Sequence, residues 1–177
     1  MGTLFRPVPG CRQPRRGFTL VELMVVVAVV VVLLASAGPA MSSFATANQI
    51  AAAKSTFAGA LALARSEAAK RGTSVIVQAR GSAPSGNEFG AGWDVVVDTN
   101  GNGSVDTSDL TVRSFDALPS GVKLSGAATI VYRATGYLAT ATDKTYTVCR
   151  ASGSHDGFQV TVTASGVTDI LAINSCS

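Results

Sequence analysis

A run of apolar residues near the start of the chain constrains its structure more than any other feature. Seventeen of the twenty residues from Phe18 to Ala37 are apolar, and the exceptions are Thr19, Glu22 and Ser36. As a helix, a run of this length spans the hydrocarbon core of a bilayer, which is about 30 Å thick. The many valines would favour a strand in water, but an isolated strand leaves its backbone polar groups unpaired in lipid. The run therefore predicts a membrane-spanning helix.

The charges around this run predict its orientation. The 177 residues include 14 Lys and Arg and 11 Asp and Glu, for a net charge of +3. Four arginines and no acid lie in residues 1–17, which places the N-terminus in the cytoplasm. The remaining residues carry ten basic and eleven acidic side chains, a net charge of −1, so the basic total is no argument for a nucleic-acid partner. With 47% apolar and 14% charged residues, the composition excludes a disordered chain.

The residues that lead into the run form a specific motif. The stretch Arg15-Arg16-Gly17-Phe18-Thr19-Leu20-Val21-Glu22-Leu23 resembles the leader-peptidase site of type IV pilins and type II secretion pseudopilins. The resemblance implies a leader at residues 1–17, cleavage after Gly17 and N-methylation of Phe18. It also implies a prepilin peptidase and methylase, other major and minor pilins or pseudopilins and an inner-membrane assembly platform as partners. The alternative is a secretory signal or signal anchor that matches by chance.

Two features inside the apolar run have expected roles. A lone carboxylate in hydrocarbon is costly, so Glu22 is a functional candidate by default. The resemblance implies that Glu22 pairs with the N-terminal ammonium of a neighbouring subunit and sets the register of a filament. The alternative is that Glu22 stays hydrated near the membrane surface. Pro39 follows Gly38 and cannot donate to the helical hydrogen bonds, so we expect a kink or local melting of the helix there.

The helical pattern continues beyond the membrane. Apolar residues recur at helical spacing through residues 40–72, with basic residues before a terminating Gly72. They are Phe44, Ile50, Phe57, Leu61, Ala64 and Ala68. One long helix from Phe18 to Arg71 is therefore expected, with a transmembrane half at residues 18–39 and an amphipathic half at residues 40–72. The stretch Leu61-Ala62-Leu63-Ala64-Arg65-Ser66-Glu67-Ala68-Ala69-Lys70-Arg71-Gly72 resembles the GspH/FimT group of minor pilins and pseudopilins.

After Gly72 the pattern changes to the alternation that is typical of strands. The predicted strands are Ser74–Ala79, Gly92–Asp98, Leu110–Phe115, Val122–Leu124, Thr129–Arg133, Thr145–Arg150, Gln159–Thr163 and Thr168–Asn174. Short strands separated by Gly, Ser, Asn and Asp predict an antiparallel sheet, and a helix across it gives an α+β fold of the pilin type. Residues 73–177 are expected to form this domain in the periplasm, with Trp93 in its core.

Of the three cysteines, Cys11 lies in the leader. Cys149 and Cys176 are left, and an oxidising cell envelope favours a disulfide between them. Free thiols and pairing between subunits are the alternatives.

The loop from Asp98 to Asp109 has the spacing of an EF-hand calcium loop. Its oxygen ligands would be Asp98, Asn100, Asn102, Asp106 and Asp109, with a glycine at the sixth position. The flanks read as strands, however, and the last ligand position holds Asp in place of the usual Glu. A hairpin turn is the alternative. No cofactor is required by any other pattern, and calcium is the single candidate.

Neither catalysis nor DNA binding is favoured. Ser154-His155-Asp156 contains the one histidine, but adjacent residues rarely converge as a catalytic triad needs. The resemblance to FimT-like DNA-uptake pilins would require arginines in the stretch Gly166-Val167-Thr168-Asp169, where none occurs. We therefore expect a minor pilin or pseudopilin that primes or caps a type IV pilus or related filament. The alternatives are a type II secretion pseudopilin that acts in protein export and, disfavoured, a DNA-binding minor pilin.

Overall fold

The structure, a computed structural model, describes residues 17–81, 84–152 and 156–176, without the side chains of residues 35–40. The chain divides into two compact units, Met1–Met41 and Ser42–Ser177, and helix α1 (Leu20–Arg71) contributes to both. Residues Gly38 and Pro39 lie within α1, and the kink expected there stays a prediction. Within the described residues, no helix has both the length and the apolar character needed to cross a membrane.

Eight strands follow the helix, as the alternating pattern predicted. They are β1 (Val75–Ala79), β2 (Trp93–Val97), β3 (Leu110–Phe115), β4 (Val122–Ser125), β5 (Thr129–Tyr132), β6 (Lys144–Arg150), β7 (Gly157–Val162) and β8 (Thr168–Ile173). All pairings between them are antiparallel. The α+β fold with a long N-terminal helix is therefore confirmed.

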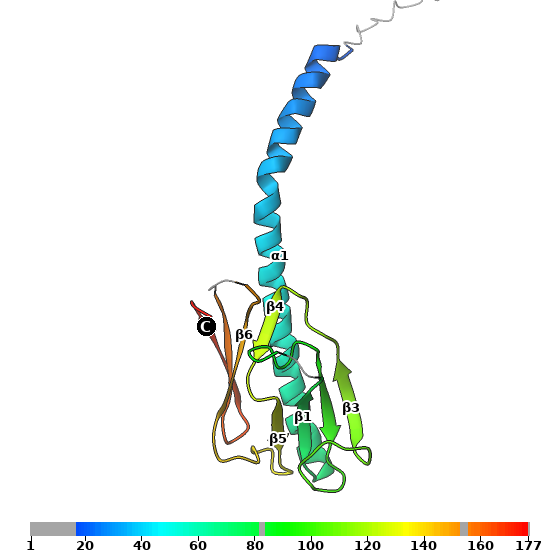
Figure 1. Cartoon of the computed structure of the whole chain (residues 1–177), viewed down its shortest axis with the longest axis vertical. Helices are drawn as coiled ribbons and strands as arrows, with labels where there is room; N and C mark the ends of the chain where they lie inside the picture. Colours follow the sequence, from blue (N-terminus) through cyan, green and yellow to red (C-terminus); the bar gives the residue numbers. More distant parts are fainter. Residues whose placement is uncertain (1–16, 82–83, 153–155, 177) are drawn as a thin grey trace, which may run out of the picture. The chain divides into compact units, whose positions relative to one another are not determined.

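The strands form two sheets, where a single sheet was expected. The first has the order β3-β2-β1-β5 and the second the order β4-β6-β7-β8. In Figure 1, strands β1 to β3 and strands β6 to β8 lie on either side of the C-terminal half of α1. The split follows from the path of the chain, because β5 returns to pair with β1 while β4 pairs with β6.

One face of α1 supplies its share of the core. Ile50, Ala53, Phe57, Ala64 and Ala68 are all buried, at steps of three, four or seven residues. They pack in one cluster with inward side chains of both sheets. Phe44 was expected on this face, but its side chain is 66% exposed. The step of six positions from Phe44 to Ile50 corresponds to about 1.7 helical turns, which rotates Phe44 away from the packed face.

An aromatic cluster lies at the centre of this core. The ring of Phe57 makes edge-to-face contacts with Phe89, Trp93 and Tyr146, at centroid distances of 5.0, 5.5 and 5.1 Å. Trp93 belongs to the first sheet and Tyr146 to the second, so Phe57 connects the helix to both. The prediction that Trp93 is a core residue is confirmed, since it is 1% exposed.

The helix ends as its sequence predicts. Glu67 accepts bonds from Arg71 at 2.8 Å and from Lys70 at 3.3 Å, and these bonds lower the pKa of its carboxyl group. Gly72 takes a positive φ of 67°, and its N–H donates to the carbonyl of Ala68. A glycine tolerates this left-handed conformation without steric cost, so the chain can turn toward β1.

Arg65 joins the helix to two tight turns that belong to different sheets. Its guanidinium donates to the carbonyl oxygen of Ser165 at 3.2 Å, in the turn between β7 and β8. A Cβ on Gly136, after β5, or on Gly166 would come within 3.3 Å of Arg65 Nε. A Cβ on Gly166 would also lie 2.0 Å from the carbonyl oxygen of Gly136. Both glycines have a φ of 78°, so this close approach needs glycine for its space and its conformation.

A disulfide connects Cys149, in β6, with Cys176, which follows β8. Both cysteines are buried, and the bridge passes beside the start of β7. A Cβ on Gly157 would lie 2.5 Å from the sulfur of Cys176 and 2.9 Å from that of Cys149. Gly157 therefore leaves the room that the predicted bridge occupies, and the bridge ties the end of the edge strand β8 to the middle of its sheet.

Replacing Gly166 with alanine tests the contact of the two turns. Gly101→Ala is the matched control, because Gly101 also has a positive φ, of 73°, but open space around it. We expect Gly101→Ala to lower the free energy of unfolding by about 1 kcal/mol, from the left-handed conformation alone. Gly166→Ala adds the overlap with Gly136 and should cost about 3 kcal/mol or more. Urea unfolding of the full chain in detergent measures both, and equal losses would contradict the close contact.

Removing the disulfide tests its contribution to stability. Cys176→Ser opens a loop of 27 residues and should lower the free energy of unfolding by about 3–4 kcal/mol in the chain-entropy account. Dithiothreitol should destabilise the wild type by the same amount and leave Cys176→Ser unchanged. Gly157→Ala should destabilise the oxidised chain more than the reduced chain. A wild type that is insensitive to reductant would show that the bridge adds no stability.

Candidate functional site

The predicted processing site lies immediately before α1. Gly17, Phe18 and Thr19 are not helical, no atom lies within 4 Å of a Cβ built on Gly17, and Phe18 is 80% exposed. The peptide bond between Gly17 and Phe18 is thus accessible in a non-helical stretch, which is the form of substrate that a peptidase can bind. Residues 1–16, with the leader arginines and Cys11, lie outside the described residues.

Glu22 has a local partner that the sequence analysis missed. Its backbone N–H donates to Thr19 Oγ1 at 3.2 Å, and its carboxylate accepts a long bond of 3.5 Å from the N–H of Thr19. This reciprocal pair is a capping box, which satisfies free donors at a helix start, and the negative charge suits the helix dipole. The signal was present as Thr-x-x-Glu directly before an apolar run. Glu22 therefore stabilises the first turn of α1 in addition to any role between subunits.

The helix beyond Glu22 has an apolar surface without cover in the single chain. Every side chain from Val21 to Leu34 is exposed. Large apolar side chains dominate this surface, at Leu20, Val21, Leu23, Met24, Val25, Val26, Val27, Val29, Val30, Val31, Val32, Leu33 and Leu34. Glu22 is the one charged residue between Arg16 and Lys54. An apolar surface of this extent marks a site of contact with protein or lipid.

The Asp98 loop is closed by its own hydrogen bonds. Asp98 is 1% exposed, and its carboxylate accepts the backbone N–H groups of Gly101, Asn102 and Gly103 at 2.7 to 3.1 Å. The carboxylate of Asp109 accepts the N–H of Thr99 at 3.0 Å, across the base of the loop. These bonds, all made within the loop, support a hairpin between β2 and β3.

The remaining predicted calcium ligands contact one another. Asn100 and Asn102 both donate to Asp106 at 2.8 Å, and Ser108 donates to the same carboxylate. The Ser108 hydroxyl and N–H, with the two amides, hold the pKa of Asp106 well below its usual range. Among the residues that the structure describes, no group of three or more His, Cys, Asp and Glu side chains is arranged to hold a metal ion. Calcium binding by the loop stays a prediction.

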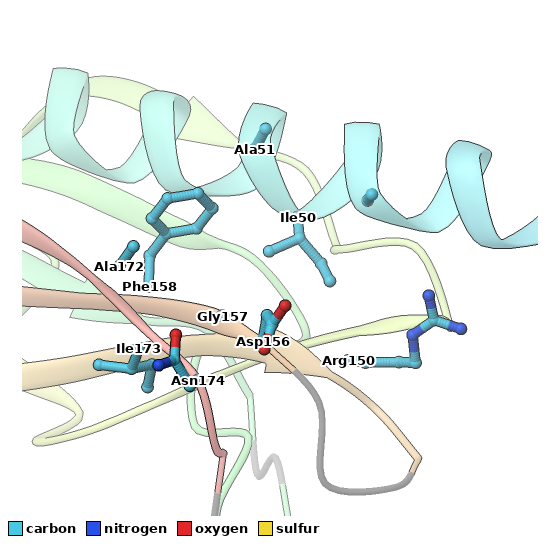
Figure 2. A pocket seen from close by; sticks show the side chains of 10 residues that line it. Ile50, Ala51, Arg150, Asp156, Gly157, Phe158, Ala172, Ile173 and Asn174 are labelled. Carbon is cyan, nitrogen blue, oxygen red and sulfur yellow. The ribbon is translucent and has the colours of Figure 1, made fainter.

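A groove lies between α1 and the edge of the second sheet (Figure 2). Its volume is about 500 Å³, and it is lined by Ala47, Ile50, Ala51, Arg150, Asp156, Gly157, Phe158, Ala172, Ile173 and Asn174. In Figure 2 the side chain of Ile50 on α1 faces the strands, Phe158 lies beside Ala172 toward one end, and Arg150 lies at the other end. The ammonium of Lys54 lies 4.4 Å from the centre of the Phe158 ring. The groove thus combines apolar side chains with the charged groups of Arg150 and Asp156, which is a composition found in protein contact sites.

Two further stretches, Ser154-His155-Asp156 and Gly166-Val167-Thr168-Asp169, were not favoured as a catalytic or a DNA-binding site. Ser154 and His155 lie outside the described residues, and Asp156 is an exposed residue at the groove margin. Gly166, at the position of the absent arginine motif, is held in the turn that contacts Arg65. Val167 and Asp169 are exposed beside it. The prediction that DNA does not bind here stays a prediction.

Known families match both parts of the chain. The family model described as type II transport protein GspH matches residues 53–166, and the prokaryotic N-terminal methylation motif matches residues 12–38. None of the curated proteins matches the chain.

Two solved structures that resemble this chain are crystal forms of one protein. A crystal structure of the type IV minor pilin FimU of Pseudomonas aeruginosa, in space group P21, aligns with a TM-score of 0.62. The alignment covers 76% of this chain and 99% of FimU at 20% identity. A second crystal form, in space group P65, aligns with a TM-score of 0.53 at 21% identity, over 66% of this chain and 91% of FimU. At this identity the likeness concerns the fold. The family model covers more than half of the 177 residues, and the chain belongs to the GspH family, as a GspH/FimT-type minor pilin or pseudopilin.

Proposed function

We propose that this protein is a filament subunit that is made as a prepilin and enters a type IV pilus or a related filament. In this proposal a prepilin peptidase cleaves after Gly17 and a methylase modifies Phe18. The single-pass α1 then holds the subunit in the inner membrane, with its sheets in the periplasm. The observation that supports the proposal is the exposed apolar surface of α1 from Leu20 to Leu34, directly after a methylation motif.

Filament entry gives that apolar surface a partner. In the membrane, lipid covers it, and in a filament the equivalent helices of neighbouring pilins or pseudopilins would cover it. An inner-membrane assembly platform would transfer the subunit between the two states. Glu22, as the one charge on this surface, would be the contact that fixes axial register, since an unpaired carboxylate among apolar helices is costly.

A role in priming or capping the filament fits a minor subunit. The family includes both pilus subunits and secretion pseudopilins. The disulfide between Cys149 and Cys176 favours a pilus subunit over a secretion pseudopilin. The alternative is a type II secretion pseudopilin that acts in protein export. A receptor for DNA is disfavoured because no Lys or Arg follows Arg150 in the chain, and phosphate neutralisation needs clustered cations.

The maturation step is tested by the mass of the protein from its native host. Cleavage after Gly17 and methylation should give a chain that begins with N-methylated Phe18, as read by intact-mass and N-terminal fragment spectra. A mature chain that begins at any other residue would refute the prepilin part of the proposal. A Gly17→Val variant, which blocks the cleavage site, serves as the control and should keep its full leader.

The two roles of Glu22 are separated by a matched pair of variants. Glu22→Gln can keep the capping box, since Gln also occurs at this position of the motif, but it removes the charge. Thr19→Ala removes the cap, at a cost of about 1 kcal/mol of helix stability, and keeps the charge. We expect Glu22→Gln to reduce incorporation into filaments at least about tenfold, because one ion pair between apolar helices is lost. Thr19→Ala should have a much smaller effect.

Incorporation is measured by immunoblotting of sheared filaments against the membrane fraction. Equal incorporation of Glu22→Gln and the wild type would show that Glu22 serves only as a helix cap.

A further inference from the structure

The two sheets have four edge strands, and two of these edges are covered by neighbouring loops. At β4, Leu124 receives a bond from the N–H of Phe89 at 3.2 Å and donates its own N–H to Asn87 Oδ1 at 2.9 Å. At β5, the carbonyl of Val131 accepts the N–H of Ala139 at 2.8 Å. Covered edges cannot accept a further strand, which is a common protection of soluble sheets.

The other two edges differ from each other. The pairing of β3 with β2 is irregular between Val95 and Val96, and a bulge of this kind twists an edge away from partners. The edge of β8 has regular pairing over its whole length, from Thr168 opposite Val162 to Ile173 opposite Gly157. Among the described residues, no loop makes a backbone hydrogen bond to the outer side of β8.

The outward backbone groups of β8 follow from its hairpin. The N–H of Thr163 donates to the carbonyl of Val167 at 2.9 Å, so alternate residues beyond it bond to β7. The backbone groups of Thr168, Ile170 and Ala172 therefore point away from β7. Their side chains face the helix side of the sheet, because Ile170 pairs with the buried Val160. Ile170 is nonetheless 39% exposed.

Asp169 occupies one of the outward backbone donors of this edge. Its carboxylate oxygen Oδ1 accepts the N–H of Ile170, an outward donor of β8, at 3.0 Å. Asp169 is also the single charged residue of β8. A cation beside the strand would attract the carboxylate and release the N–H of Ile170 for pairing. A strand with a basic residue at this place would therefore be favoured over one without it.

The groove lies on the same side of the sheet as Ile170 and Ala172 of β8. Ala172 lines it together with Phe158, and Ala51 lies on the α1 side (Figure 2). Ala47, one turn earlier in α1, also lines it with a small side chain. A strand added beside β8 would place every second side chain over this groove, as Phe158 and Ala172 are placed now. The second sheet thus has an open edge and vacant space for the side chains of one more strand.

We propose that β8 accepts an extended edge strand from the domain of a different pilin subunit. The added strand has apolar side chains at alternate positions, which face the groove, and a Lys or Arg beside Asp169. Main-chain bonds to Thr168, Ile170 and Ala172 supply affinity, and Asp169 supplies the preference for a basic partner. The identity of the partner as a pilin rests on the proposed function. The capacity of β8 to bind a strand does not.

A peptide titration tests the proposal. The probe is a short fluorescein-labelled peptide with capped ends that alternates valine and threonine around a central lysine, and a second peptide carries glutamate in place of the lysine. Fluorescence anisotropy is measured with the full chain in detergent micelles at one detergent concentration, so that binding to micelles is equal for all variants. The wild type should bind the lysine peptide about threefold to tenfold more tightly than the glutamate peptide.

Two variants make the test specific to the edge. Ile170→Pro removes an outward N–H that the pairing with β7 does not use, and it should weaken binding of the lysine peptide at least about tenfold. Asp169→Lys should reverse the preference between the two peptides. Leu171→Ala, on the opposite face of β8, is the matched control and should bind like the wild type.

The outcomes are decisive in each direction. Equal binding of the lysine peptide by Ile170→Pro and the wild type would overturn the proposal. If Ile170→Pro fails to fold, as circular dichroism would show, Asp169→Lys decides alone, and an unchanged preference overturns it. Self-association of the wild type that Ile170→Pro abolishes would make a second copy of this chain the occupant, and would also overturn it. A failure of Phe18 methylation in the host would refute the proposed maturation and leave these binding results intact.

Discussion

The unit from Ser42 to Ser177 depends on burial of one helix face between two sheets. Phe57 is the centre of this arrangement, because its ring contacts Trp93 of the first sheet and Tyr146 of the second within about 5.5 Å. Neither sheet has another layer that could cover its inner face among the described residues. Arg65, on the same helix, donates to the carbonyl of Ser165 and lies beside the turns of Gly136 and Gly166, where the two sheets meet. The contact between the Gly136 and Gly166 turns thus depends on the packing of both sheets around Phe57.

The elements were predictable because their signals are local. The helix face from Ile50 to Ala68 and the eight strands follow from the spacing of apolar residues over a few positions, and the structure confirms them. The division into two sheets was not predicted, since it depends on which strands meet after long excursions of the chain. Phe44 was placed on the wrong face because residues at mixed spacings were grouped by hydrophobicity without following the rotation of the helix.

The candidate site was predictable in its chemistry and less so in its geometry. The methylation motif was recognised by its resemblance to prepilin leaders, and the pair Cys149–Cys176 from the oxidising compartment that the resemblance implies. The role of Glu22 between subunits stays a prediction. The capping box of Thr19 and Glu22 could also have been recognised, from Thr and Glu three positions apart at the start of a helix. It was missed because the same residues belong to the methylation motif. The open edge of β8 and its groove depend on the spatial position of α1, β7 and β8, which no local pattern contains.

The capping box would give Glu22 a second partner for its charge if the proposed ion pair between subunits forms. A cation that draws the carboxylate away from the N–H of Thr19 would cost the helix start a bond. The net gain of that ion pair would then be smaller than its own strength, which would keep the contact reversible. Amide exchange at Thr19 would then report on whether a subunit is free or engaged.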